Sequence, residues 1–140
     1  MYTQKLLIKK IKLLGKVIDA PERLLYGLEK QNQYAQPYIE CKFPFYYLIT
    51  SENGKEIERQ KFQNIELLLY SVFEKVTFDM ALEYEVKHRI PSQDSRRVLF
   101  SHQLYLMGKL SPKWHDQLEQ KIFEIVKYNP YQDSEHKGLL

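Results

Sequence analysis

Few of the residue types that carry out catalysis occur in patterns that would let them act together. The four histidines are His88, His102, His115 and His136. None belongs to an HExxH or similar spacing that would place two ligands on one metal ion. Glu85 and His88 form a Glu-x-x-His pair, as in di-iron helix bundles, but that chemistry needs the pair twice and the chain has it once. We therefore expect no metal site and no cofactor.

Nucleophilic catalysis is also poorly supported. Cys41 is the only cysteine, and it falls in a predicted strand with no base nearby in the sequence. The role of a small buried apolar residue suits it better than that of a nucleophile. The chain has no Gly-x-Ser-x-Gly motif and no glycine-rich phosphate loop. We expect a protein that is not an enzyme, although a hydrolase site assembled from distant residues stays open as an alternative.

The densest polar cluster lies at the corner between two predicted helices. Its charged members are Glu83, Glu85, Arg89, Asp94, Arg96 and Arg97, with Gln93 among them. Asp94 is placed to cap a helix, and Arg89 can reach Glu85 at i, i+4. One interpretation is an ion-pair network that fixes the helix crossing. The other is a recognition surface for a protein partner, since arginine is favoured at interfaces.

Residues 4–18 are predicted to form a basic amphipathic helix, because apolar residues recur with the spacing of one helix face. They are Leu7, Ile11, Leu14 and Ile18. Lysines repeat the same spacing on another face: Lys5, Lys9, Lys12 and Lys16. The apolar face is expected to pack on the rest of the protein. Binding to an anionic membrane surface and binding to a phosphate backbone are the alternatives.

The next segment changes to the pattern of strands, which we place at about 38–42, 45–51 and 56–62. Asn53-Gly54 supplies the positive φ angles of a two-residue type I′ hairpin. Pro44 should separate the first two strands. The third strand is polar and suits a solvated edge. The sequence leaves open which face of the second strand is buried.

Three helices should complete the fold. The first runs from an N-cap at Asn64 to about His88, and only a narrow polar stripe interrupts its apolar surface, which predicts a largely buried helix. A second should span about 93–107. Ser111-Pro112 then begins a third, which runs to about Tyr128. Its expected apolar face consists of Trp114, Leu118, Ile122 and Ile125.

These elements predict an α+β fold: a small antiparallel sheet of about three strands (residues 38–62), flanked by the N-terminal basic amphipathic helix and three C-terminal helices. The length of 140 residues suits one domain. We place it at residues 1–128, with the helix of residues 1–20 packed on it, and expect a flexible tail over 129–140.

Composition and charge limit the compartments and partners that suit the protein. A single cysteine rules out an internal disulfide and fits the reducing cytoplasm. Lysines interrupt every apolar run near the start, so neither a signal peptide nor a membrane span is expected. The net charge is +3, which is too weak to indicate a nucleic-acid partner. Residues 1–18 carry +5 and the remainder −2, so a basic arm precedes a mildly acidic body.

Residues 67–81 (LLLYSVFEKVTFDMA), followed by Glu83-Tyr84-Glu85, resemble bacterial polymorphic-toxin immunity proteins, in particular the immunity protein 63 family. The similarity continues through a series of short motifs: Arg89-Ile90, Gln93-Asp94, the run from Arg96 to Phe100, Gln103, and Leu110 to Trp114. It covers about residues 45–130, which leaves the basic arm and the tail outside.

The resemblance implies a cytoplasmic protein that binds and neutralises a toxin domain encoded beside it, with no catalytic residues and no cofactor. Immunity proteins against nucleases are often strongly acidic, and the charge of +3 departs from that pattern. A nuclease target is therefore not implied. A small nucleic-acid-binding module that uses the lysine-rich helix is the alternative function. The sequence does not set the oligomeric state.

Overall fold

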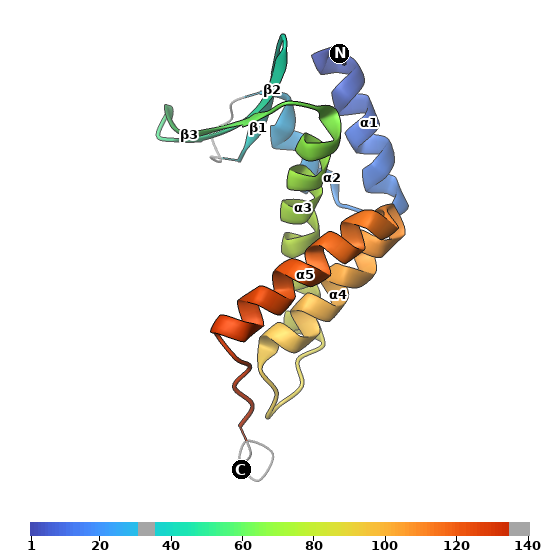
Figure 1. Cartoon of the computed structure of the whole chain (residues 1–140), viewed down its shortest axis with the longest axis vertical. Helices are drawn as coiled ribbons and strands as arrows, with labels where there is room; N and C mark the ends of the chain where they lie inside the picture. Colours follow the sequence, from blue (N-terminus) through green and yellow to red (C-terminus); the bar gives the residue numbers. More distant parts are fainter. Residues whose placement is uncertain (31–35, 135–140) are drawn as a thin grey trace. The chain divides into compact units, whose positions relative to one another are not determined.

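A computed structural model describes residues 1–30 and 36–134, and it has the predicted α+β architecture. The chain divides into two compact units, Met1–Phe73 (unit 1) and Glu74–Leu140 (unit 2). The elements follow the order α1 (Gln4–Val17), α2 (Glu22–Leu25), η1 (Tyr26–Glu29), β1 (Tyr38–Lys42), β2 (Phe45–Glu52), β3 (Lys55–Phe62), α3 (Ile65–Lys87), α4 (Ser95–Leu110) and α5 (Pro112–Tyr128) (Figure 1). Helix α3 contributes its first turns to unit 1 and the rest to unit 2.

The sheet of unit 1 is antiparallel, with strand order β1-β2-β3. Asn53 and Gly54 have φ angles of 52° and 77°, which confirms the predicted type I′ hairpin between β2 and β3. Phe43-Pro44, a cis peptide, forms the turn between β1 and β2. Strand β3 is exposed along almost its whole length, so its expected role as a solvated edge is confirmed.

The structure answers the question of which residues of the central strand β2 are buried. Tyr46, Leu48 and Ile49 are all buried, so both faces of β2 are partly covered. Leu48 pairs with the buried Ile39 of β1. The Tyr46 hydroxyl accepts a hydrogen bond of 2.8 Å from the backbone N–H of Tyr2. This bond ties the start of the chain to the sheet.

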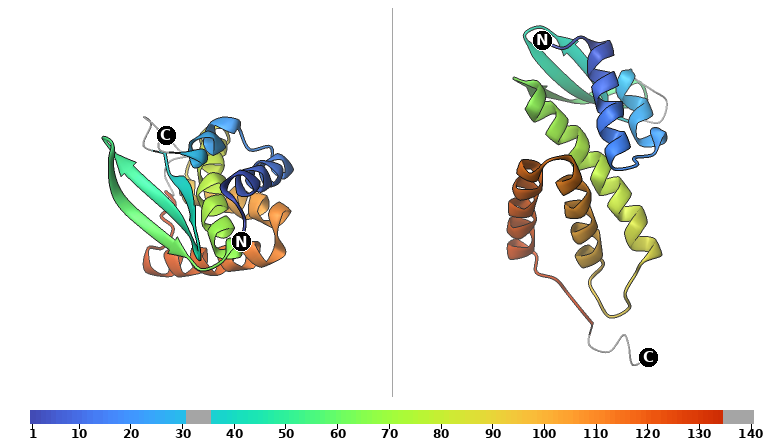
Figure 2. Two further views of the ribbon diagram at one scale, coloured as in Figure 1. Left: turned by 90° about the horizontal axis from the view of Figure 1, so that it is seen from above. Right: turned by 90° about the vertical axis from the view of Figure 1, so that its right-hand side faces the viewer.

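Helix α1 lies beside the sheet, and its apolar face is buried (Figure 2). Leu7, Ile11 and Ile18 are at most 3% exposed. The Thr3 side chain caps the helix by accepting from the N–H of Leu6. A Cβ atom on Gly15 would lie 2.7 Å from Cδ1 of Leu25, so any larger residue here would force the Leu25 side chain of α2 to shift.

In unit 2, helix α3 is less buried than the sequence predicted. Phe78, Leu82 and Val86 are 38%, 44% and 62% exposed, whereas Ala81 and Glu85 of the same segment are buried. The expectation of a helix exposed only along a narrow polar stripe is therefore wrong for this segment. Hydrophobicity marks which residues can be buried, but the number of neighbouring helices decides how many are.

A buried polar contact joins α3 to α4. The Gln103 side chain donates to the carbonyl of Glu74 at 3.1 Å and to the Thr77 hydroxyl at 3.3 Å. Gln103 and Thr77 are both buried, so this contact satisfies polar groups that water does not reach. Lys121 of α5 pairs with the Glu74 carboxylate at 2.8 Å.

The helix boundaries follow the predicted caps closely. The side chains of Asn64 and Ser111 accept hydrogen bonds from the backbone N–H of the third residue of α3 and α5, as expected. Helix α4 begins at Ser95, two residues later than predicted, because Asp94 is its N-cap. On α5, Ile125 is 38% exposed and does not join the other buried residues of its expected face. Among the described residues, no helix has the length and apolar character needed to cross a bilayer.

The burial of Ile11 leads to a stability prediction. Ile11→Asp should lower the free energy of unfolding by about 2–4 kcal/mol, because it places a charge in an apolar site and removes apolar contacts. Leu13→Asp is the matched control, since Leu13 lies exposed on the same helix. It should cost at most about 1 kcal/mol through helix propensity. Urea unfolding measures both, and equal losses would contradict the observed docking of α1.

Candidate functional site

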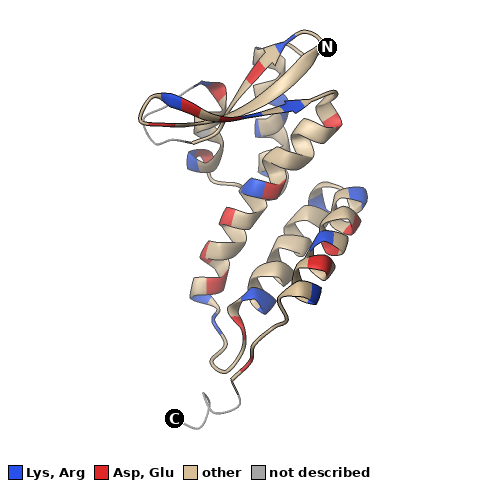
Figure 3. Ribbon diagram, turned by 60° about the vertical axis from the view of Figure 1, so that its left-hand side comes forward, with Lys and Arg blue, Asp and Glu red and all other residues tan. Residues whose placement is uncertain are grey.

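The six charged residues singled out in the sequence all lie in unit 2, around the connection between α3 and α4. Glu83 and Glu85 are in the last turns of α3, and Arg89 follows that helix. Asp94 caps α4, and Arg96 and Arg97 lie in its first turn. Acidic residues recur along this part of α3 (Figure 3). Glu83 is exposed there. Two hydrogen-bonded groups contain the other five residues.

The first group is the predicted pair of Glu85 and Arg89. The guanidinium donates two hydrogen bonds of 2.9 Å, from Nε to Oε2 and from Nη2 to Oε1. Glu85 is buried, whereas Arg89 is exposed. The hydrogen bonds from Arg89 lower the pKa of the Glu85 carboxyl. The pair holds the residues after α3 against its last turn.

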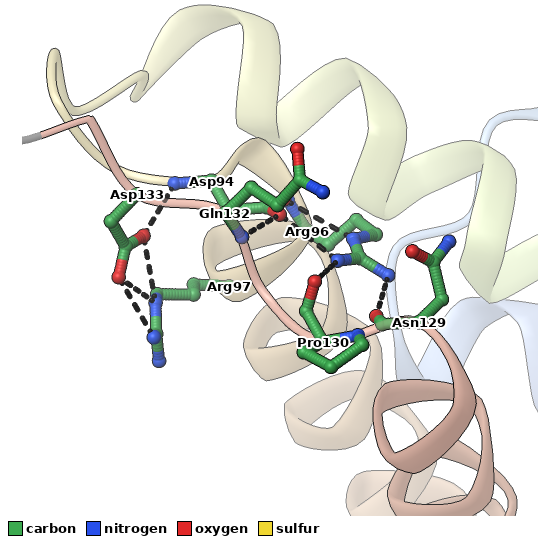
Figure 4. A network of polar contacts seen from close by, with 7 residues as sticks. All are labelled: Asp94, Arg96, Arg97, Asn129, Pro130, Gln132 and Asp133. Carbon is green, nitrogen blue, oxygen red and sulfur yellow. Dashed lines mark hydrogen bonds and ion pairs between the residues drawn. The ribbon is translucent and has the colours of Figure 1, made fainter.

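The second group is centred on the Asp94 carboxylate (Figure 4). Its Oδ1 accepts from the backbone N–H of Arg96 at 2.9 Å and from Arg96 Nε at 3.2 Å. Its Oδ2 accepts from Arg96 Nη2 at 3.0 Å and from the backbone N–H of Gln132 at 2.8 Å. These bonds, with those from the Arg96 guanidinium the strongest, hold the pKa of Asp94 well below its usual range.

Arg96 extends this group to the chain that follows α5. It donates to the carbonyls of Asn129 at 2.8 Å and Pro130 at 2.9 Å (Figure 4). Its side chain is only 23% exposed. These residues belong to the segment expected as a flexible tail. Residues 129–134 are described and make these contacts, whereas 135–140 lie outside the described residues.

Arg97 points in a different direction from Arg96 and is more accessible. It donates to both oxygens of Asp133, at 3.1 Å from Nε to Oδ1 and 2.9 Å from Nη2 to Oδ2. These bonds lower the pKa of Asp133. The guanidinium also lies 4.2 Å from the centre of the Tyr131 ring. The Arg97 side chain is 42% exposed, so one side of it is open to a partner.

A stack of aromatic rings lies beside Arg97, and the sequence did not predict it. Tyr84 lies between two imidazoles, with ring centres 3.8 Å from His88 and 3.7 Å from His102. Tyr105 lies farther out, 5.8 Å from His102. Burial, and to a smaller extent His88, lowers the pKa of His102. The i, i+4 spacing of Tyr84 and His88 was the available signal, but it could not show that α4 brings His102 to the same stack.

Arg97 and the outer rings line an open groove. Tyr84, His102 and Tyr105 form part of its wall, together with Gln93, Val98 and Ser101. The groove therefore offers a guanidinium, an imidazole, phenols and an amide within a small area. Arginine and tyrosine in such a setting are typical of protein-binding surfaces.

The contacts of the residues considered for catalysis do not favour that role. Arg89 occupies both carboxylate oxygens of Glu85, so the Glu85–His88 pair is not arranged as a metal site. Burial raises the pKa of the Cys41 thiol, which lowers its thiolate fraction. Ligand atoms of His115, Asp116 and Glu119 lie within 4.8 Å of one another, but both carboxylates are exposed. Exposed acidic groups often lie this close without a metal.

The fold and the groove thus describe a small α+β protein whose accessible polar groups suit contacts with another macromolecule. The chain belongs to the immunity protein 63 family, whose model matches residues 42–124. The match includes β2, β3, α3, α4 and most of α5, with all six predicted site residues, and leaves α1 outside. No curated protein matches the chain, and no solved structure does.

The lowered pKa of Asp94 leads to a pH prediction. Because the folded state holds this pKa below its unfolded value, the ion pair stabilises the protein above about pH 4, and this contribution is lost as the pH falls further. Asp94→Asn keeps a capping oxygen but lacks the charge. The variant should be less stable at neutral pH, and its deficit should shrink in acid. Thermal melts of both proteins from neutral pH to about pH 2 measure this, and a constant deficit would contradict it.

Proposed function

We propose that this protein binds a cognate bacterial toxin domain and neutralises it by stoichiometric association, which protects the cell that produces the toxin. Membership of the immunity protein 63 family carries this proposal. The toxin would belong to a polymorphic system delivered between neighbouring cells, as in contact-dependent inhibition. The immunity protein would meet it in the cytoplasm. The free thiol of Cys41 fits this reducing compartment.

Inhibition without catalysis fits the contacts of the charged residues in unit 2. The carboxylates of Glu85 and Asp94 and the guanidinium of Arg96 are engaged in ion pairs and hydrogen bonds, and Arg89 holds Glu85 through Nε and Nη2. We assign these four residues a structural role. Their function is to hold the connection between α3 and α4 in one conformation, so that the neighbouring surface is pre-organised for binding.

We assign the toxin contact in unit 2 to Arg97 and the groove beside it. The groove presents Arg97 and Tyr105, the residue types that most often anchor protein interfaces. Glu83 is exposed on α3 and is the remaining candidate among the six. A standard interface buries about 800 Å² per partner, so the contact would extend beyond this groove.

The proposed inhibition predicts rescue and co-purification. Expression of the C-terminal domain encoded by the gene immediately upstream should arrest growth, and co-expression of this protein should restore it. The two proteins should co-purify at a ratio near one to one, because blocking by association consumes one inhibitor per toxin. Quantitative gel filtration of the complex measures the ratio. Rescue at far lower amounts of inhibitor, with turnover of the toxin, would contradict inhibition by binding.

Substitutions of the neighbouring Arg96 and Arg97 should have different effects, one mainly on stability and the other mainly on toxin affinity. The reason is that adjacent helical residues point about 100° apart. Arg96→Ala should lower the free energy of unfolding by about 1–2 kcal/mol, since it leaves Asp94 and two carbonyls without their donor. Toxin affinity of the folded fraction should stay nearly unchanged.

Arg97→Ala should show the opposite pattern. An anchor arginine typically weakens a complex about thirtyfold when it is truncated, and the loss of stability should be the smaller of the two variants. Urea unfolding and titration calorimetry with the toxin domain measure both quantities. Matching profiles of the two variants would show that this division of roles is wrong.

A further inference from the structure

The outward side of α1 carries a row of lysines with little to neutralise it. Lys5, Lys9, Lys12 and Lys16 follow one another along the helix, which contains no acidic residue. Lys12 pairs with Glu29 at 3.0 Å, but both side chains are about half exposed. Such exposed pairs contribute little to stability. Within residues 1–30 and 36–134, the other three lysines of the row form no ion pair.

An exposed apolar stripe runs beside these lysines. Leu6, Leu13 and Val17 are 55%, 56% and 50% exposed, although the same helix buries Leu7 and Ile11 almost completely. Leu13 and Ile8 also line an open groove whose other walls are Gln4, five lysines and Glu29. The helix therefore has two apolar sides. One packs inside unit 1, and the other, next to the lysines, is accessible.

We propose that this lysine–leucine face, formed by Lys5, Lys9, Lys12, Lys16, Leu6, Leu13 and Val17, docks an acidic surface of the toxin domain that also presents apolar side chains. The proposal rests on the proposed function and adds the chemistry of the partner. Carboxylates on the toxin would lie against the lysines, and its apolar residues would cover the leucines. The long-range attraction would speed association, while the apolar contacts would slow dissociation.

The structure favours an acidic protein over the other anionic partners. A helix that lies on a membrane needs its main apolar face free, and the face of α1 with Leu7, Ile11 and Ile18 is buried in the protein. A phosphate backbone would neutralise the lysines but would leave the three exposed apolar residues in water. Base stacking needs exposed aromatic rings. Helix α1 itself contains none, and the ring centre of Tyr2, which precedes it, lies 5.9 Å from the ammonium of Lys10.

The position of α1 in the chain gives this face a role in specificity. The family match begins at residue 42, so α1 lies outside the segment that defines the family. The contacts of its buried side hold the helix in place before a partner arrives. The lysine–leucine face is therefore a pre-ordered surface that can differ between family members without changing their common fold.

Charge reversal on this face tests the proposal. Lys9→Glu/Lys16→Glu should weaken binding to the upstream-encoded toxin domain by about tenfold or more at low salt, mainly through a slower association rate. Lys42→Glu/Lys55→Glu is the matched control, because it changes the same charge on exposed lysines of the same unit. It should bind nearly as the parent protein does. Leu6→Ser/Leu13→Ser should weaken binding by raising the dissociation rate.

Surface plasmon resonance with the toxin domain, DNA duplexes and phosphatidylserine vesicles as separate analytes distinguishes the outcomes, with thermal melts confirming that each variant folds. Equal toxin affinity of all three variants and the parent protein would overturn the docking face and leave the proposed function intact. Binding of the parent protein to DNA or vesicles, lost on lysine reversal while toxin binding is unchanged, would overturn it in favour of that partner. A parent protein that does not bind the toxin domain would refute the proposed function itself.

Discussion

The carboxylate of Asp94 is the point on which the organisation of unit 2 depends. It caps α4, pairs with Arg96 and accepts from the backbone of Gln132, so one side chain joins the start of a helix to the chain that follows α5. A charged acceptor that receives four hydrogen bonds restricts the conformation of every group that donates to it. The connection between α3 and α4 is thereby defined, and so is the direction in which Arg97 projects.

This arrangement separates side chains that brace the fold from side chains that stay accessible. Arg96 has neighbours on all its polar atoms, while Arg97 shares its guanidinium with Asp133 and Tyr131 and still borders an open groove. Helix α1 makes the same separation with apolar residues, since one side packs in unit 1 and the other is exposed with the lysines. In the function proposed above, these are the surfaces that would contact the toxin domain.

Most of the local structure was predictable from short-range chemistry. Asn53-Gly54 allowed only a narrow set of turns, and Asn64, Asp94 and Ser111 marked helix starts because their side chains can satisfy free backbone N–H groups. The pair of Glu85 and Arg89 followed from i, i+4 spacing on a helix. The family, too, was recognisable from the motifs between residues 67 and 114. The turn, cap and ion-pair signals each lie within a few residues of the atoms whose positions they predict.

The tertiary structure decided what depends on distant neighbours. Whether Phe78 is buried is set by how many helices pack on α3, which periodicity does not encode. Tyr84 stacks on His102, which is 18 positions away in the sequence. Arg97 pairs with Asp133, which is 36 positions away. Sequence alone determined the helices, the sheet and the charged corner, because those follow from local hydrogen bonding and hydrophobic period. Which charges brace the fold and which stay accessible was decided by packing, because it depends on where separate segments meet in space.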